Sequence, residues 1–490
     1  MKKKIFSAVA LFLALCAFAS CGSGATAKTD NGMKLLTEGM SYTKAAKHEA
    51  LPNATLDFAY LGGHDVMPIG VFNGPSYYGD NSSWSNGVIT QPSSYYDGYY
   101  FTLLKNAGIN HIGTFDNMYM NDPQVFIDNM DMAYRHGLGS FMWDNYLYQN
   151  PTPEAIGARI REYIDHPGLM GWHVLDEPWM NALPPLKPLY DSYASLESPE
   201  TEGKHLFVNL FPGYVVSEAL DYKTWEEYLR TFMETTHSKL ICYDHYVFSA
   251  KDNNGTMGKA SYFRDLLTAG KVAKEFGVPF WVYVQTGAQW DYPQETVAVW
   301  PSEAEFLWNV NTSVGYGAKG IQYFQGVQWI SNALEPDGGV NSERLGFIGV
   351  QGNVNRWYYY AQKAHKQLIA ADEILMNSAL AGVITVGEIA KSNNADNAKY
   401  FDANFQEGNW RELKSVNAKE VLVSCFDYCG TSAFWVVNNS AFEKDIVKLN
   451  FDKEYGCDII QRGQNFPVAA KTVVLNLEPG EAALVTLRTA

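Results

Sequence analysis

The sequence predicts an α/β chain, with a (β/α)8 TIM barrel followed by a small C-terminal all-β sandwich domain. Eight short apolar runs begin about 30 to 40 residues apart, the length of a strand, a crossover helix and two loops. After residue 380 apolar residues recur at every second position, which is typical of strands with one buried face. The 490 residues suffice for both domains.

The eight barrel runs are apolar or aromatic, and most of them end in polar residues. They span residues 67–72, 109–115, 140–143, 169–175, 204–210, 239–243, 279–284 and 318–324. Amphipathic spacing predicts helices at 153–164 and 303–315, and a further helix at 355–375 is expected to close the barrel. A Gly-x-Gly-x-x-Gly turn does not follow the first run, which argues against a dinucleotide-binding sheet.

The C-terminal runs are short and are separated by Gly, Asn, Asp and Pro. They span residues 383–386, 421–426, 433–438, 446–451, 457–461, 472–477 and 483–487. Strands of this length with turn residues between them indicate an antiparallel sandwich. We therefore expect a barrel over residues 46–380 and a sandwich over residues 381–490.

The N-terminus has the pattern of a targeting signal. Three lysines precede an apolar run over residues 5–19 that is too short for a transmembrane helix. The small residues Ala19 and Ser20 lead into Cys21, so that residues 1–21 resemble a bacterial lipoprotein signal and residues 22–45 form a flexible tether. This predicts secretion across the inner membrane and a lipid anchor on Cys21 in the outer membrane. Simple secretion is the alternative.

Composition excludes several partners. The chain has 37 Lys+Arg against 53 Asp+Glu, a net charge of −16, which repels phosphate backbones and anionic lipid headgroups. We expect no nucleic-acid partner, and no membrane contact except through the lipid. His173 and His245 lack metal-ligand spacing, and the cysteines of the mature chain have no nearby His at such spacing, so neither a metal nor another cofactor is expected.

Polar residues at the C-terminal ends of the runs are the candidate site, because function collects at this end of a barrel. Eight residues are expected to contact substrate: Asp116, Asp144, Trp143, Asp176, Tyr246, Gln285, Trp290 and Gln322. Asn209 ends the fifth run. The tryptophans and tyrosine offer flat apolar faces that suit sugar rings as well as a protein core.

Glu177 is the strongest catalytic candidate. It follows Asp176 directly, and two adjacent carboxylates raise one another's pKa, which favours a proton donor near neutral pH. Pro178 predicts an extended backbone at Glu177. Capping of the following helix is the alternative role for this acidic pair. Asp244, at the end of the sixth run, is the expected second carboxylate, with a substrate-binding or supporting role as its alternative.

These residues resemble a known family. The chain looks like a secreted (β/α)8 glycoside hydrolase of the β-galactosidase- and cellulase-like group whose fourth strand ends in Asn-Glu-Pro or Asp-Glu-Pro. The resemblance implies that Glu177 is the general acid/base and that Asp176 contacts the sugar. Residues 301–305 and 317–324 are similar to the last barrel unit of β-galactosidase-like enzymes, and residues 477–481 resemble the closing strand of an appended sandwich. Retaining members carry a nucleophilic Glu on strand seven, where this sequence has Gln285.

We therefore expect a glycosidase that cleaves O-glycosidic bonds of a poly- or oligosaccharide with Glu177 and Asp244 as its two carboxylates. The departure at Gln285 motivates a rival prediction, a non-catalytic glycan-binding lipoprotein on a degenerate barrel. A third prediction is a barrel hydrolase or lyase that needs a metal and loses activity with a chelator.

Overall fold

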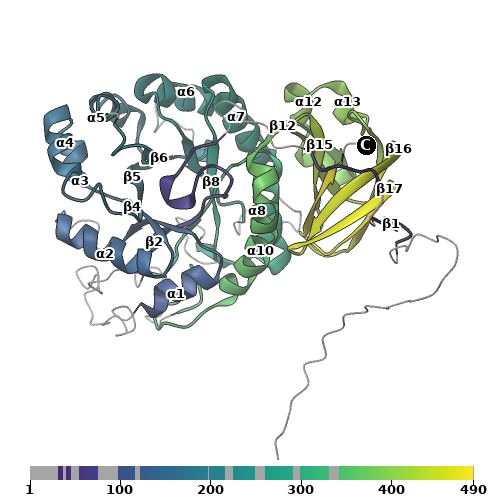
Figure 1. Ribbon diagram of the computed structural model, residues 1–490, viewed down its shortest axis with the longest axis horizontal. Coiled ribbons are helices and arrows are strands. Elements are labelled where there is room, and N and C mark those ends of the chain that lie inside the picture. The colour runs from purple at the N-terminus through teal and green to yellow at the C-terminus, as the bar shows by residue number, and fades with distance from the viewer. Residues whose placement is uncertain are drawn as a thin grey trace, which may run out of the picture.

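The fold predicted from the sequence is confirmed. A computed structural model describes residues 31–36, 40–45, 55–75, 98–115, 122–196, 198–215, 224–248, 260–290, 298–329 and 341–488. It contains a closed eight-stranded parallel barrel with helices around it and a separate antiparallel β domain at the C-terminal end (Figure 1). The predicted signal and Cys21 lie outside the described residues. Within the described part, every helix is too short or too polar to cross a membrane.

Each barrel strand overlaps one of the eight predicted runs. In chain order the strands are β2 (Ile69–Gly74), β3 (His111–Phe115), β4 (Gly139–Met142), β5 (Leu169–Asp176), β6 (His205–Leu210), β7 (Ile241–Asp244), β8 (Phe280–Gln285) and β11 (Ile321–Phe324). Neighbours in the chain pair in parallel, and β11 closes the barrel by pairing with β2, with Ile321 opposite Ile69. The alignment of the strands brings their C-terminal residues to one end.

Helices cover the outside of the barrel (Figure 1). They are α1 (Tyr99–Asn106), α2 (Pro123–Arg135), α3 (Asn145–Gln149), α4 (Pro153–Ile160), α5 (Leu186–Ala194), α6 (Trp225–Thr236), α7 (Ala260–Phe276), α8 (Glu303–Gly315) and α10 (Arg356–Met376). Short polar side chains cap the starts of α2, α3, α4, α6, α8 and α10. In α8 the Ser302 hydroxyl accepts from the Glu305 N–H, and the Glu305 carboxylate accepts from the Ser302 N–H, a capping box.

Aromatic side chains fill the barrel interior below the C-terminal end. Phe141, Phe207 and Trp281 are buried against one another. Phe58 packs on this group from the N-terminal end of the strands, next to the short helix η1 (Ala59–Leu61). The crowding is tight enough that Gly171 of β5 has φ +143°, and a Cβ there would lie 1.9 Å from the carbonyl oxygen of His205. A packed lower interior leaves the C-terminal end for a site.

The C-terminal domain is an eight-stranded antiparallel sheet around one core. Its strands are β12 (Ser378–Val386), β13 (Leu413–Asn417), β14 (Val421–Tyr428), β15 (Thr431–Asn438), β16 (Asp445–Gln461), β17 (Gln464–Leu477), β18 (Ala482–Leu487) and β1 (Lys34–Leu35). The predicted strands 446–451 and 457–461 are one long strand, β16, whose register against β17 shifts between Asn450 and Tyr455. Apolar side chains of β12, β14 and β15 share a buried core with those of β16 and β17, as in a sandwich.

Three parts of the C-terminal domain were not predicted, and the first is strand β13. The short helices α11 (Glu388–Asn393), α12 (Asn397–Tyr400) and α13 (Ala403–Gln406) lie between β12 and β13. Residues 34–35, within the predicted tether, form β1 and pair with β17. A two-residue edge strand has no period of its own, so the sequence pattern could not indicate it.

Helices α8 and α10 lie between the barrel and the C-terminal sheet (Figure 1). The Trp308 indole N–H donates to the side chain of Asn439 at 2.7 Å, and the Trp435 indole N–H donates to the carbonyl of Asn311 at 2.9 Å. Lys319, which precedes β11, is buried and donates to the carbonyls of Leu375 and Ser378 at the junction of α10 and β12. These hydrogen bonds attach the sandwich to one side of the barrel.

Candidate active site

Two strands of the barrel, on either side of β6, bring three carboxylates together at its C-terminal end. Asp176 ends β5, Glu177 follows it, and Asp244 ends β7. Asn209 of β6 lies between them. Its side-chain nitrogen donates to Asp176 Oδ1 at 2.9 Å and lies 3.5 Å from Asp244 Oδ1. The backbone carbonyl of Asn209 accepts from the Glu177 N–H at 2.8 Å. Asn209 therefore holds the three acidic residues in one cluster.

Glu177 has an unusual backbone. Its φ is +44°, in the left-handed region that residues other than glycine rarely adopt, so the expectation of an extended backbone before Pro178 is wrong. The hydrogen bond from the Glu177 N–H to β6 holds this turn in place. Such backbone conformations cost about 1 to 3 kcal/mol and concentrate at functional sites, where the surrounding structure enforces them. The turn separates the direction of the Glu177 side chain from that of Asp176.

The cluster is a strongly perturbed acid group. Burial raises the pKa of Asp176 to about 6, and the hydrogen bond from Asn209 opposes this rise. Burial and the charge of Asp176 raise the pKa of Glu177 to about 7, while a hydrogen bond with Asp244 lowers it. Burial, then the charges of Glu177 and Asp176, raise the pKa of Asp244 well above its usual value. The pair of Glu177 and Asp244 thus holds a proton near neutral pH.

Aromatic side chains lie near the acid cluster and in the barrel interior beside it. Trp143 is partly buried, lies 4.7 Å from the ring of His173 and donates its indole N–H to Asn145 at 2.9 Å. The rings of Tyr246 and Phe324 have centroids 6.4 Å apart. Burial, and then the charges of Asp244 and Glu177, raise the pKa of Tyr246. The buried hydroxyl of Tyr283 has no hydrogen-bond partner among the described residues. The predicted residues Trp143 and Tyr246 are therefore close to residues of the cluster or of the barrel interior beside it.

Two other predicted substrate-binding residues, Asp144 and Gln322, form hydrogen bonds inside the protein. Asp144 accepts from Arg159 Nε at 2.6 Å and from the Tyr163 hydroxyl at 2.8 Å, and it caps α3 through the Tyr146 N–H. Gln322 is fully buried, and its carbonyl oxygen lies 3.0 Å from His111 Nε2. These contacts give both side chains a structural role in this state of the protein.

Gln285 is also bound within the protein. Its carbonyl oxygen accepts from the Phe248 N–H at 2.8 Å, and its amide N–H groups donate to the carbonyls of Phe248 and Gly287 at 2.9 and 3.0 Å. The side chain is 1% exposed. The amide therefore supports the loop that follows β7.

Of the remaining predicted site residues, Asp116 and the side chain of Trp290 lie outside the described residues.

The histidines of the site have internal partners. His173 Nε2 is 3.1 Å from the carbonyl of Leu175, and burial lowers its pKa to about 3. His245 Nδ1 is 2.7 Å from Oδ2 of Asp265, an α7 residue that the sequence analysis missed because nothing in a helical pattern marks it. Within the part of the chain that the structure describes, no group of three or more His, Cys, Asp and Glu residues is arranged to hold a metal ion. The four cysteines of that part form no disulfide with one another.

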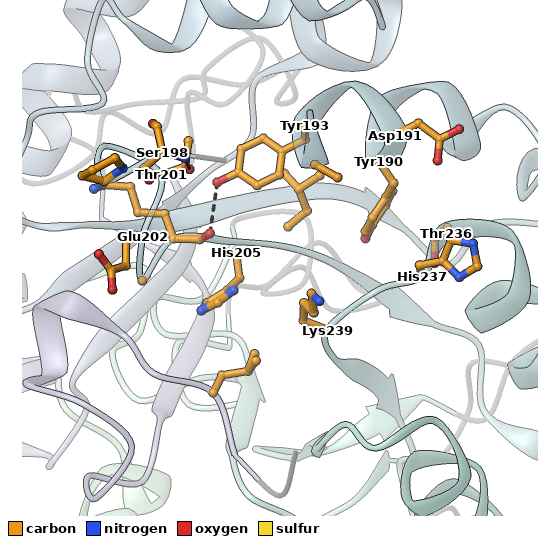
Figure 2. Close-up of a pocket in the computed structure, with 16 residues that line it drawn as sticks. Tyr190, Asp191, Tyr193, Ser198, Thr201, Glu202, His205, Thr236, His237 and Lys239 are labelled. Atoms are coloured by element: carbon orange, nitrogen blue, oxygen red, sulfur yellow. Dashed lines mark hydrogen bonds between the residues drawn. The ribbon is translucent and has the colours of Figure 1, made fainter. Parts of the chain in front are cut away.

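A cavity of about 470 Å³ lies at the opposite end of the barrel. Figure 2 shows it between α5, the start of β6 and the end of α6, with Tyr190, Tyr193, His205 and Lys239 around it. The Tyr193 hydroxyl donates to the carbonyl of Lys204 at 3.0 Å. The cavity contains none of the acid cluster, and barrel chemistry belongs to the other end of the strands. We therefore place the candidate active site at the acid cluster.

Comparisons with known proteins find a similar fold in a solved β-galactosidase structure. No family model and no curated protein sequence matches this chain. Among solved structures, a catalytic mutant of a GH42 β-galactosidase from G. stearothermophilus is similar with a TM-score of 0.53 at 10% identity, over 86% of this chain and 98% of that one. A family 5 glycoside hydrolase from Bacteroides vulgatus reaches a TM-score of 0.47 at 11% identity, over 86% and 89% of the chains. At such identity the likeness to the β-galactosidase shows the fold alone.

Proposed function

We propose that this protein is a glycoside hydrolase that cleaves O-glycosidic bonds of a poly- or oligosaccharide. The observation that carries the proposal is the contact between Glu177 and Asp244 at the C-terminal end of a barrel shared with a β-galactosidase. Glycoside hydrolysis needs one carboxyl group that is protonated near neutral pH and a second carboxylate on the other side of the sugar. A raised pKa of about 7 suits Glu177 to the first role.

In the proposed reaction Glu177 protonates the glycosidic oxygen as the bond to the anomeric carbon breaks. Asp244 acts in the same step, either as a base that activates the attacking water or as a nucleophile on that carbon; in the second case water then hydrolyses the glycosyl ester, with Glu177 as the base. A hydrogen bond joins the two carboxyl groups in this structure. They are therefore closer together than the roughly 5 to 9.5 Å that separate such pairs in retaining and inverting enzymes. We propose that a bound sugar separates them and replaces their mutual hydrogen bond. Asp176 and Asn209 would stay behind as the hydrogen-bonded support of the pair.

Gln285 favours a second candidate function. Its amide occupies the strand position of the nucleophile in the enzymes that the sequence resembles, and all of its described hydrogen bonds go to the backbone of the protein. An amide in this setting cannot form a glycosyl-enzyme bond. If Asp244 does not supply the second carboxylate, the barrel would bind glycans without cleaving them. This rival predicts ligand affinity with zero turnover.

We further propose that the protein is exported and anchored by a lipid on Cys21. The support is the sequence alone: three N-terminal lysines, the apolar run 5–19 and the small residues before Cys21. Expression of the full chain and of Cys21→Ser in a bacterial host tests this. Lipid labelling and detergent partitioning of the first, and their loss in the second, are the expected results. Equal partitioning of both would leave simple secretion.

The function is tested with the protein that lacks residues 1–21 and a panel of plant, host and microbial glycans. Glu177→Gln and Asp244→Asn should each reduce sugar release at least about a hundredfold, the size of lost general acid–base help. Asp191→Asn is the matched control, because Asp191 is an exposed carboxylate in a surface ion pair with Lys187. Full activity of Glu177→Gln would overturn the site, and binding without cleavage by the wild type would establish the rival.

A further inference from the structure

Tyr214 is an exposed aromatic residue next to the acid cluster. It lies in the short helix η6 (Gly213–Val215), directly after β6, and is 53% exposed. Its ring meets the ring of His245 edge-on, with centroids 5.0 Å apart and an interplanar angle of 87°. His245 is the residue after Asp244, so the Tyr214 ring stands beside the end of β7.

The phenol of Tyr214 lies within reach of the charges of the acids, and the residue is partly open to solvent. Burial of the hydroxyl and the charges of Asp244 and Glu177 raise the pKa of this phenol, and a hydrogen bond with the Tyr246 backbone opposes the rise. The phenol is therefore neutral at every pH at which the acid pair works, and it retains its O–H. A neutral tyrosine offers an apolar ring and a hydrogen-bonding tip, the combination that a sugar needs on one face.

Asp265 of α7 determines where Tyr214 stands. One of its oxygens, Oδ2, lies 2.7 Å from His245 Nδ1 and also accepts from the Gly213 N–H at 2.8 Å. The side chain of Asp265 is 7% exposed, and that of His245 is 2% exposed. A single buried carboxylate thus joins the loop after β6 to the loop after β7 and holds Gly213 and His245, the neighbours of Tyr214, in place.

The residue before Tyr214 must be glycine for this contact to form. A Cβ at Gly213 would lie 2.1 Å from Asp265 Oδ1 and 2.8 Å from Oδ2. No side chain fits in that space, so the carboxylate approaches the backbone N–H only where a glycine stands. The local sequence Gly213–Tyr214 therefore combines the space for the Asp265 carboxylate with the aromatic residue that this carboxylate positions.

We propose that Tyr214 forms the wall of the sugar subsite beside Glu177 and Asp244, and that Asp265 is its positioning residue, acting through Gly213 and His245. This inference rests on the proposed function and deepens it by naming a residue that determines how the sugar is held. Asp265 does not touch the sugar in this arrangement. Its effect reaches the substrate only through Tyr214, which gives the inference a measurable signature.

The test is a double-mutant cycle on the protein lacking residues 1–21, with the panel of glycans as probes for both binding and cleavage. Tyr214→Ala should raise KM, or the Kd for a glycan that only binds, about tenfold and change kcat less than about threefold. Asp265→Ala should raise KM by a similar factor. In the Tyr214→Ala background, Asp265→Ala should add less than about twofold, because the residue through which it acts is gone.

Two variants separate positioning from a general loss of structure. Asp265→Asn keeps an oxygen that can accept from Gly213 and His245, so it should restore KM to within about threefold of wild type. Tyr359→Ala removes a tyrosine of matched exposure, 54%, on α10 and should leave KM unchanged. If Asp265→Ala fails to fold, Gly213→Ala replaces it, because the added methyl group displaces the same carboxylate.

The outcomes distinguish this inference from the proposed function. Wild-type KM in Tyr214→Ala, with Glu177→Gln inactive, overturns the subsite wall and leaves the hydrolase in place. Fully additive effects of Tyr214→Ala and Asp265→Ala overturn the positioning role. A wild-type protein that neither binds nor cleaves any glycan of the panel overturns the proposed function, and this inference falls with it.

Discussion

The carboxyl groups of Glu177 and Asp244 are hydrogen-bonded to each other, although each belongs to a different strand unit of the barrel. Asn209 lies on the strand between them. Its side-chain N–H donates to Asp176 and is 3.5 Å from Asp244 Oδ1. Two carboxyl groups that are hydrogen-bonded to each other share a proton, so the observed pKa values belong to the pair and not to either residue. The carboxyl groups of Glu177 and Asp244 therefore hold a proton between them at the C-terminal end of the barrel.

The shared proton predicts an alkaline limit on activity. The pKa of Glu177 is raised to about 7, so above that pH Glu177 loses the proton that would go to the leaving oxygen. We expect kcat/KM to fall about tenfold per pH unit above the apparent pKa. A profile of kcat/KM from pH 5 to 9 on a cleaved glycan measures this. Activity that stays constant up to pH 9 would rule out Glu177 as a proton donor with this pKa.

Asp176→Asn should move that alkaline limit to lower pH. The charge of Asp176 is the second cause of the raised pKa of Glu177, after burial, and removing it stabilises the ionised form of Glu177. The variant keeps a side-chain oxygen that can accept from Asn209. The midpoint of the alkaline limb should therefore fall, by an amount read from the pH profile against Asp191→Asn as control. An unshifted midpoint would show that the two carboxylates do not interact in the working enzyme.

Stability should decrease as pH rises through the titration of the cluster. Asp176 and Glu177 have folded-state pKa values of about 6 and 7, above those of the unfolded chain near 4, so the folded state binds more protons between these limits. The free energy of unfolding then falls with rising pH. Glu177→Gln removes one of these charges and should be more stable than wild type at pH 8, by about 1 to 3 kcal/mol.

Denaturant unfolding of wild type and Glu177→Gln at pH 5 and pH 8 checks this prediction. The difference between the two proteins should be larger at pH 8 than at pH 5, where Glu177 is protonated in the folded state. An equal difference at both pH values would mean that the charge of Glu177 carries no cost.

The barrel and the acid cluster were accessible to sequence reasoning because their signals are local. Each strand is a short apolar run, and Asp176, Glu177 and Asp244 stand directly at the ends of such runs. The use of Asp144 was not accessible, since it depends on Arg159 and Tyr163 from the following helix and loop. A carboxylate at a strand end looks the same in sequence whether it faces a sugar or a guanidinium group.

The same limit explains what was missed and what was misjudged in the backbone. Asp265 lies in the middle of α7, where an acidic residue normally means a solvated face, and only the folded chain brings it under Gly213. The rule that a residue before proline is extended failed at Glu177, because the hydrogen bond to β6 holds its φ at +44°. Tertiary contacts override local preference at such positions.

Asp144→Ala should unfold the barrel more readily without a specific effect on chemistry. The side chain of Asp144 is fully buried and that of Arg159 is 10% exposed, so the variant removes the nearer, buried carboxylate of this guanidinium and leaves the more exposed Glu162 at 3.8 Å. Such a loss costs about 3 to 5 kcal/mol. The folded fraction should retain wild-type KM, measured at a temperature well below the unfolding transition. A raised KM with unchanged stability would instead restore the substrate-binding role predicted for Asp144.

Gln285→Glu tests whether the strand position of the missing nucleophile can be refilled. The amide N–H groups of Gln285 donate to the carbonyls of Phe248 and Gly287, and a carboxylate there would face these two acceptors with no proton to give. The side chain is 1% exposed, so solvent cannot compensate. We expect a loss of about 2 to 4 kcal/mol in the free energy of unfolding and no gain in turnover.

Gln285→Met is the matched variant, because it has a similar length, removes the hydrogen bonds and introduces no charge. It should destabilise the protein less than Gln285→Glu does, since no buried charge opposes the two carbonyls. A Gln285→Glu protein that is stable and cleaves glycans faster than wild type would mean that this strand end faces the substrate after all. It would also show that the second carboxylate of the site belongs on β8 and not at Asp244.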